Sequence, residues 1–311
     1  MRVLSLVVAC VVLLVLTPFV GGSLEWDSAS WVMLQLRLPR VVLGALVGAT
    51  LGIVGAAFQA VFENPLATPS TIGTTAGASL GALAVLVLVP VGVSIGTPMV
   101  AAGAFVGALV ASFGVATLAA VRQLRTDELL LAGIAVTLAA GAITTGLQVA
   151  ADSAATFQAV RWSLGSLSVV GYRSVLVLAP VSVVTIVVIL LQSRALEAMV
   201  AGQDLAATQG VNVTSTRTIS LGVGALGVAA CVAAAGPIAF VGLLVPHLVR
   251  LVVGASRRKL LPLSAVVGAS LLPVADALAR VVLPGQELPV GVLTAALGAP
   301  LLLALLVRRK R

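Results

Sequence analysis

The chain has 311 residues, of which 60% are hydrophobic and 9% are charged, and its formal net charge at pH 7 is +8. Soluble domains carry about 25% charged residues, and the mean hydropathy of +1.21 excludes a soluble globular protein. Nucleic-acid binding is not expected from the positive charge, because no basic stretch is interleaved with aromatic residues, which make up only 4%. We predict a single all-α domain over residues 1–311 that crosses the lipid bilayer several times.

The first apolar segment runs from Val3 to Leu24, behind a single arginine. A short basic start and an apolar core also suit a cleaved signal peptide. The Thr-Pro-Phe sequence at 17–19 interrupts the core, and no small-x-small cleavage site follows it. We therefore expect a retained first helix and then a short polar loop in which Trp26 lies at the membrane interface, where tryptophan is enriched.

A second helix is predicted from Arg37 to Phe62, and a tight reversal at 63–67 leads into a third. Glycines recur at every fourth position on both segments; they are Gly44, Gly48 and Gly52 on the first and Gly73, Gly77 and Gly81 on the second. Small residues at this spacing let helix backbones approach closely in a membrane, where lipid provides no hydrophobic drive for packing. We expect these glycines to line helix–helix contacts.

The uncharged segment from Asn64 to Val121 has 58 residues, which is enough for two spans of about 20 residues each. The sequence between Pro90 and Pro98 is the predicted turn between them. Further helices are expected from Thr126 to about Ala150, from Ser174 to Ser193, from Thr218 to the break at Ala235-Gly236-Pro237, from there to about Arg250, from Leu260 to about Arg280, and from Val290 to Val307. The mixed segment 152–173 is predicted to form short surface helices. The total is ten membrane helices.

Lysine and arginine are distributed asymmetrically over the loops that these ten helices define. If both termini face the cytoplasm, 13 of the 18 basic residues fall in cytoplasmic segments and five fall outside. This asymmetry has the sign of the positive-inside rule. We therefore predict that both termini are cytoplasmic, since an added or missing helix would mix the two groups of charges.

Residues with obvious catalytic or energy-coupling chemistry are sparse. No G-x-x-x-x-G-K-[S/T] phosphate loop occurs, so the chain is not expected to bind a nucleotide in that way. Asp276 is the one carboxylate predicted to lie within a span, and Arg280, one helical turn further on, is its expected ion-pair partner. His247 has no second histidine or cysteine cluster near it, so a structural role is favoured over metal ligation. We expect no cofactor and no catalytic residue.

The connection 194–217 is the longest polar segment of the chain. Residues 201–210 have the length of a short helix, and Asp204 would lie in its first turn, where a negative charge meets the positive end of the helix dipole. A helix lying across the cytoplasmic face could receive another protein and move the adjoining spans.

Several motifs resemble the permease subunits of importers for iron chelates, haem and cobalamin. They are RLPR at 37–40, ENPLA at 63–67, GTTAGASLGA at 73–82, GPIAFVGLLVPHLVR at 236–250 and ELPVGVLTAALGAP at 287–300. The resemblance implies a ten-helix permease in a bacterial cell membrane that pairs with a second copy or a paralogue. It also implies two ATP-binding-cassette ATPases on the cytoplasmic side and an extracytoplasmic substrate-binding protein. An iron–siderophore complex is the expected cargo, with cobalamin and haem as alternatives.

The resemblance also assigns two groups of residues. Contact with the ATPase is expected in the polar connection, at Ala201, Gly202, Asp204, Ala207 and Gly210; docking of the binding protein is expected at Arg37, Arg40 and Arg280. The family usually carries a repeated Leu-Gly pair in the polar connection, and this chain has Ala201-Gly202 and Gln209-Gly210 instead. Interfacial snorkelling is the alternative interpretation of the three arginines, and for Arg280 so is pairing with Asp276. The two cations of RLPR, one helical turn apart beside a proline that fixes the helix start, favour docking.

Two other classes of protein stay open at this point. An ion-coupled secondary carrier would explain ten helices but not the long polar connection. An integral membrane enzyme would need a cluster of catalytic residues at one face. An ATPase and a binding protein encoded by neighbouring genes would distinguish the importer from both.

Overall fold

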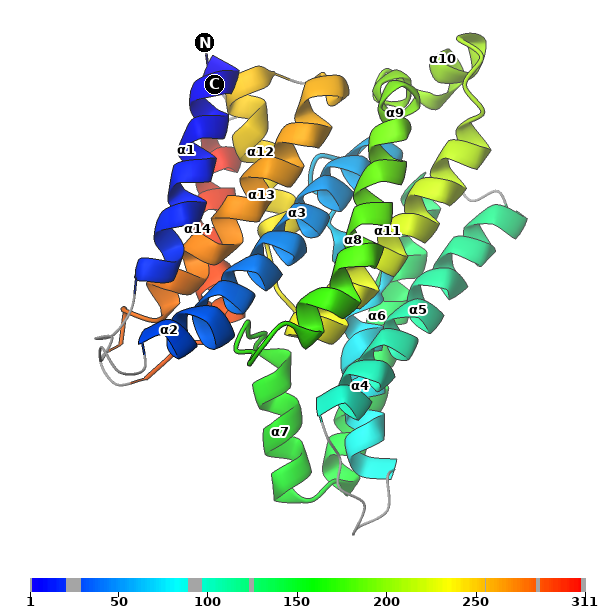
Figure 1. Ribbon diagram of the computed structural model, residues 1–311. Helices are drawn as coiled ribbons and strands as arrows, with labels where there is room; N and C mark the ends of the chain where they lie inside the picture. Colours follow the sequence, from blue (N-terminus) through cyan, green and yellow to red (C-terminus); the bar gives the residue numbers. More distant parts are fainter. Residues whose placement is uncertain are drawn as a thin grey trace.

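The computed structural model describes residues 2–20, 29–88, 97–122, 126–254, 256–283 and 286–308, and every regular element in these ranges is a helix (Figure 1). The α-helices are α1 (Arg2–Leu16), α2 (Ala29–Trp31), α3 (Leu38–Val61), α4 (Thr74–Leu88), α5 (Thr97–Arg122), α6 (Thr126–Ala150), α7 (Ser153–Ser163), α8 (Arg173–Leu191), α9 (Ser193–Met199), α10 (Gln203–Thr208), α11 (Val213–Ala235), α12 (Val241–Val253), α13 (Arg257–Ala279) and α14 (Val290–Arg308). Three shorter elements are η1 (Thr17–Phe19) and η3 (Pro69–Ile72), both 3₁₀-helices, and η2 (Val32–Arg37), a π-helix.

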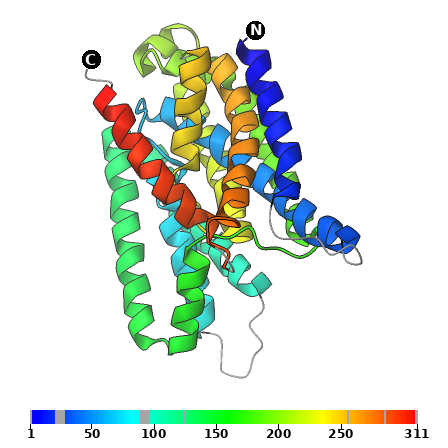
Figure 2. The ribbon, with the colours of Figure 1, turned by 90° about the vertical axis from the view of Figure 1, so that its left-hand side faces the viewer.

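The long helices run between two opposite faces of one bundle (Figure 1, Figure 2). One face carries α9, α10, the start of α1 and the end of α14, and we call it the α9–α10 face. The other carries α7 and is called the α7 face. The two ends of the chain therefore lie at the same face, as an even number of spans requires.

Six of the described helices are long and apolar enough to cross a membrane, and the longest combines η2 with α3 over Val32–Val61. Four shorter apolar helices, α1, α4, α12 and α14, accompany them. Each of the ten predicted spans thus corresponds to a helix, and the chain is an all-α, multi-pass protein of the cell membrane. The polar loop around Trp26 falls within residues 21–28 and the Pro90–Pro98 turn falls mostly on 89–96, which lie outside the described residues.

The second span begins earlier than predicted, at Ala29 rather than at Arg37. Its first turns form η2, in which the Leu38 N–H donates to the Met33 carbonyl. The π turns arise because Pro39 has no N–H to donate to the carbonyl of Gln35 one turn earlier. That carbonyl instead accepts from the Gly171 N–H at 2.7 Å. The wider π turns thus accommodate the proline. The sequence before Arg37 carries no charge back to Ala29 and forms the first turns of the helix.

Side-chain caps place two other helix starts. Asp152 accepts from the Ala155 N–H at 2.6 Å and begins α7, the surface helix expected in segment 152–173. Asn212 accepts from the Ser215 N–H at 2.9 Å, so α11 begins at Val213, five residues before the predicted Thr218. The prediction had placed that start after a charge, Arg217, whereas a capping side chain decides it.

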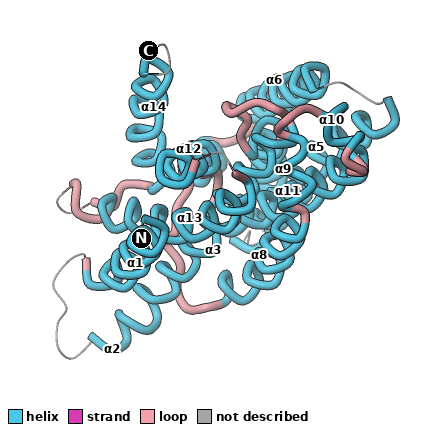
Figure 3. The backbone as a smooth tube through the Cα atoms, turned by 90° about the horizontal axis from the view of Figure 1, so that it is seen from above, coloured by secondary structure: helices cyan, strands magenta, loops and turns pink. Residues whose placement is uncertain are grey.

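The centre of the bundle is α3, which contacts α8, α11, α12 and α13 (Figure 3). A Cβ added at Gly48 would lie 2.0 Å from the Gly268 carbonyl oxygen of α13, and one at Gly52 would lie 2.4 Å from the Ser264 oxygen. At Gly44 the nearest atoms would belong to Leu167, at 3.0 Å. The glycines on this helix thus bring the α3 and α13 backbones into direct contact, which side chains would prevent.

A second close contact joins α4 to α5. Added Cβ atoms at Gly77 and Gly81 would lie 2.4 Å and 2.1 Å from the carbonyl oxygens of Gly107 and Gly103. Gly73 departs from the predicted ladder, because it precedes α4 with a φ of +80° and ends η3. The left-handed backbone, which glycine adopts without a Cβ penalty, makes Gly73 a turn residue rather than a member of the helix face.

Candidate functional site

An ion cluster lies at the α7-face ends of α3 and α13. Arg40 donates to both carboxylate oxygens of Asp276, with Nε 2.8 Å and Nη2 2.9 Å away, and its Nη1 donates to Glu287 at 2.8 Å. The Asp276 side chain is only 3% exposed, whereas that of Glu287, just before α14, is 55% exposed. Arg40 therefore ties α3 to α13 and to the start of α14 with three charge-assisted hydrogen bonds.

Arg280 and Arg37 complete the ion cluster. The Arg280 Nε lies 3.5 Å from Asp276, and its Nη2 donates to the Thr17 carbonyl at 3.2 Å. Burial of the Arg280 guanidinium lowers its pKa, and the negative charge of Asp276 opposes this shift. Arg37 donates to the Pro18 carbonyl at 3.0 Å. The predicted Asp276–Arg280 pair is present, but Asp276 has a closer partner in Arg40, which the sequence did not indicate.

A cleft of about 390 Å³ opens beside these residues. Its lining includes all three arginines expected to dock a binding protein, together with Glu287 and residues 168–170. The side chains of Arg40 and Arg280 are only 12% and 7% exposed, so most of their surface is already in contact with protein. Docking at Arg37, Arg40 and Arg280 stays a prediction.

The predicted polar connection forms two short helices, α9 and α10, at the opposite face. We call residues 193–210 the coupling segment. Gly202 and Gly210 flank α10 with φ values of +113° and +82°, and an added Cβ at either would meet no atom within 4 Å. Glycine is therefore favoured at these two positions by the backbone conformation and not by close packing. The short helix that was expected over 201–210 is α10, which covers Gln203–Thr208.

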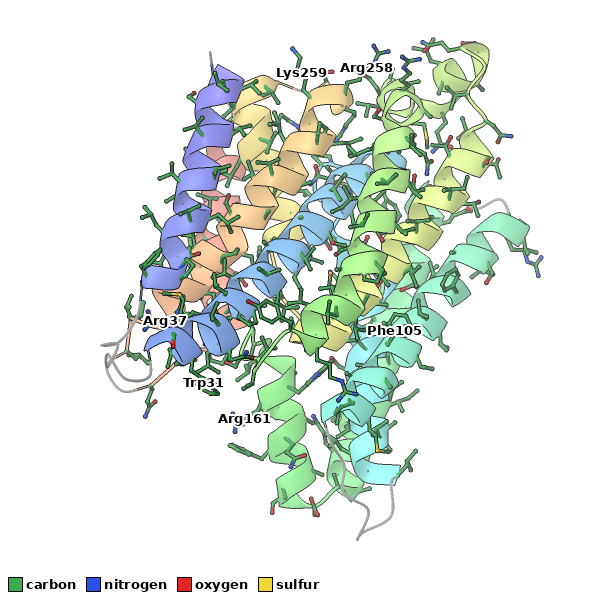
Figure 4. The ribbon with its side chains drawn as sticks, in the orientation of Figure 1. Trp31, Arg37, Phe105, Arg161, Arg258 and Lys259 are labelled. Carbon is green, nitrogen blue, oxygen red and sulfur yellow. The ribbon has the colours of Figure 1, made fainter. Side chains whose placement is uncertain are left out.

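The residues expected to contact an ATPase lie on the surface of the coupling segment. Ala201, Asp204, Ala207 and Gly210 are exposed, and Asp204 occupies the first turn of α10 as predicted. Ala206 is fully buried and holds the helix against the bundle. Arg258 and Lys259 lie at the same face near α9, whereas Arg37 lies toward the opposite one (Figure 4). The coupling segment thus offers an exposed surface at the face opposite the ion cluster.

His247 lies within α12, where its Nδ1 is 2.8 Å from the Leu243 carbonyl oxygen. Both cysteines, Cys10 and Cys231, are buried among apolar side chains. Within the described ranges no group of three His, Cys, Asp or Glu residues could hold a metal ion. His247 is placed as a helix residue bonded to its own backbone, which accords with a structural role.

A multi-pass helical bundle with a charged cleft at one end of its central helices and an exposed helical segment at the other has the organisation of a membrane permease. The sequence profile of the FecCD transport family matches residues 3–308. The chain belongs to this family.

Individual relatives extend the comparison. The cobalamin import system permease protein BtuC of Halobacterium salinarum is 41% identical over 94% of this chain and 82% of its own length. The hemin transport system permease protein HmuU of Yersinia pestis is 39% identical over 67% of this chain and 62% of its own length. The Fe(3+) dicitrate transport system permease protein FecD of Escherichia coli is 43% identical over 49% of this chain and 48% of its own.

A solved structure described as an inward-facing metal-chelate type ABC transporter superposes with a TM-score of 0.88. The match covers 98% of this chain and 99% of that one at 27% sequence identity. The whole bundle, including both ends of the α3–α13 pair, therefore has a counterpart in that structure.

Proposed function

We propose that this chain is the membrane-spanning subunit of an ATP-driven importer, which passes a bulky metal chelate from the α7 face to the α9–α10 face. The observation that carries the proposal is the FecCD profile match along residues 3–308. The α7 face would then be extracytoplasmic and the α9–α10 face cytoplasmic, in accord with the 13 to 5 distribution of basic residues. A second copy or a paralogue would complete the pathway.

Energy for this transport would come from partner chains, because the sequence has no phosphate loop. ATP-binding-cassette ATPases would bind the exposed side of the coupling segment, at Ala201, Gly202, Asp204, Ala207 and Gly210. Gly202 and Gly210, which flank α10, both have a positive φ and set the direction of the chain at the two ends of the helix. We therefore expect α10 to be displaced as a unit.

A substrate-binding protein would deliver the cargo at the cleft beside the ion cluster. The proposed contacts are Arg37, Arg40 and Arg280, and among the described residues these three cations lie with the two carboxylates of Asp276 and Glu287. An acidic side chain of a binding protein suits this charge. Because Arg40 and Arg280 are largely buried, we assign most of the direct attraction to Arg37.

The proposed cargo is an iron–siderophore complex, and the 43% identity to an iron dicitrate permease over half of the chain supports it. Cobalamin is the second candidate, because the relative that aligns over 94% of the chain belongs to a cobalamin import system. Haem is the third, from the hemin permease relative.

Uptake into proteoliposomes tests class and cargo together. The permease is reconstituted with its ATPase and binding protein, and radiolabelled ferric hydroxamate, cyanocobalamin or haemin is supplied on the binding-protein side. We expect uptake of one compound that requires ATP and is unaffected by collapsing ion gradients, and no ATP hydrolysis by the purified permease alone. Uptake driven by an ion gradient without ATP would instead identify a secondary carrier and overturn the proposal.

A further inference from the structure

Glu197 of α9 connects the coupling segment to the first residues of α13. Its Oε1 accepts from the Ser256 Oγ at 2.8 Å, and its Oε2 lies 3.1 Å from the Arg258 Nε. The side chain of Glu197 is 35% exposed and that of Arg258 is 65% exposed. One carboxylate therefore bridges two residues that flank the start of a membrane-spanning helix.

The residue between them, Arg257, points into the bundle. It is 4% exposed and donates from Nη1 to the Ala56 carbonyl of α3 at 2.9 Å. The charge of Glu197 attracts the Arg257 guanidinium, while that of Arg250 repels it. Glu197 thus offsets part of the positive charge that is buried where α13 meets α3.

The helix contacts show how a displacement of α10 would reach this point. Helix α10 packs against α9 and α11, and α9 packs in turn against α3, α8, α11 and α13. Leu196 and Met199 of α9 are fully buried, so we expect α9 to move together with the helices that it packs against. Beyond α9, direct backbone contact at Gly48 and Gly268 joins α13 to α3 along their length. Their far ends meet at the ion cluster.

We propose that Glu197 is a positioning residue which transmits displacement of the coupling segment to the α3–α13 pair, through Ser256 and Arg258. The inference rests on the proposed function, since it assigns the route by which ATPase movement reaches the membrane helices. A push on α10 shifts α9, and the Glu197 carboxylate draws the start of α13 with it. The ion cluster at the other end then responds, because Asp276 belongs to the same helix.

The test compares uptake per ATP hydrolysed in proteoliposomes that hold the complete importer. Glu197→Gln keeps the size of the side chain and an acceptor for Ser256 but removes the ion pair with Arg258. We expect this variant to assemble with the ATPase and hydrolyse ATP, while uptake per ATP falls about twofold to fivefold, the scale of one partly exposed ion pair. The probe is the radiolabelled compound that the wild-type complex imports, from ferric hydroxamate, cyanocobalamin and haemin.

Two further variants separate transmission from general stability. Arg258→Gln removes the same ion pair from the other side, and the double variant should be no worse than either single one, since both act through one contact. Lys259→Gln removes an exposed charge next to Arg258, outside the coupling segment, and should leave uptake per ATP unchanged.

Each outcome bears on one proposal. Unchanged uptake per ATP in both Glu197→Gln and Arg258→Gln, or additive losses in the double variant, would overturn the role of Glu197 and leave the importer proposal intact. Should Glu197→Gln fail to assemble, Arg258→Gln alone still decides, since the Arg258 side chain is 65% exposed and its replacement leaves the packed interior unchanged. Wild-type complex without ATP-dependent uptake would overturn the proposed function itself.

Discussion

Arg40 binds carboxylates from two other elements, and both lie more than 230 positions further along the chain. Helical spacing alone paired Asp276 with Arg280, because residues four apart are neighbours on a helix. The closer partner, Arg40, comes from another helix, and only the packing of α3 on α13 brings it there. Removing the Arg40 charge would leave the buried Asp276 carboxylate with one partner at 3.5 Å.

This arrangement sharpens the test of binding-protein docking. We predict that Arg37→Glu lowers the affinity for the loaded binding protein several-fold, since an exposed ion pair contributes about 0.2 to 1 kcal/mol and a reversed charge adds repulsion. The loss should shrink as salt rises, because screening weakens contacts between exposed charges. Binding measured by surface plasmon resonance at low and high ionic strength checks both expectations.

Two companion variants control that measurement. Arg173→Glu reverses an exposed cation outside the cleft and should have a smaller effect. Arg40→Gln is expected to act through stability instead, because breaking a buried ion pair costs about 3 to 5 kcal/mol, and its melting temperature should fall. If Arg37→Glu binds with unchanged affinity at low salt, Arg37 does not form the dock.

Residue roles could be predicted where sequence neighbours decide them and not where distant helices do. Asp204 lies in the first turn of α10, where local sequence predicts it. Arg257 belongs to a run of three basic residues in the sequence, 257–259, and yet it is buried against the Ala56 carbonyl. No sequence pattern singles out Glu197, although in the fold its carboxylate lies 3.1 Å from Arg258 of the same basic run.

At the scale of helices, apolar runs predicted which segments are helical, and caps and proline decided where they start. The second span contains π turns because Pro39 frees the Gln35 carbonyl, which accepts instead from Gly171, far along the chain. No pattern within the span indicates that partner. The fourfold glycine spacing, by contrast, lies on α3 where its backbone meets α13, because close approach requires residues without side chains.

Gly48 provides a test of this backbone contact. We predict that Gly48→Ala destabilises the protein by about 1 to 3 kcal/mol, since overpacking a tight contact forces backbone shifts. The new Cβ would lie 2.0 Å from the Gly268 oxygen, and the helices would have to separate. The midpoint of thermal unfolding in detergent, followed by size-exclusion chromatography, measures the effect.

Gly114 is the matched control, because it lies within α5 and an added Cβ meets no atom within 4 Å. Gly114→Ala should keep or raise the melting temperature, since alanine favours a helix interior by roughly 0.5 to 1 kcal/mol relative to glycine. Equal melting temperatures for Gly48→Ala and Gly114→Ala would show that the α3–α13 contact is looser than described.

At the scale of the molecule, the number of helices could be predicted because each span needs a charge-free run and each loop holds charges. The arrangement of the helices could not, since uniformly apolar faces do not specify neighbours. The ion cluster illustrates this limit. Its arginines and acids were known as single residues, but their convergence depends on how α3, α13 and the start of α14 pack.

We predict the orientation of the bundle in the membrane from its charge distribution, and labelling measures it directly. In the predicted topology, the segments on the α9–α10 side hold 13 of the 18 lysines and arginines. Lys259 lies at that face (Figure 4), and such basic segments are expected to face the cytoplasm. In a background where both native cysteines are replaced by alanine, Ser153→Cys in α7 should react with an impermeant maleimide added to intact cells. Lys259→Cys should react only after permeabilisation, and both positions are exposed, so access alone decides labelling. Reaction of Lys259→Cys in intact cells, with Ser153→Cys protected, would invert the orientation and with it the sides assigned to ATPase and binding protein.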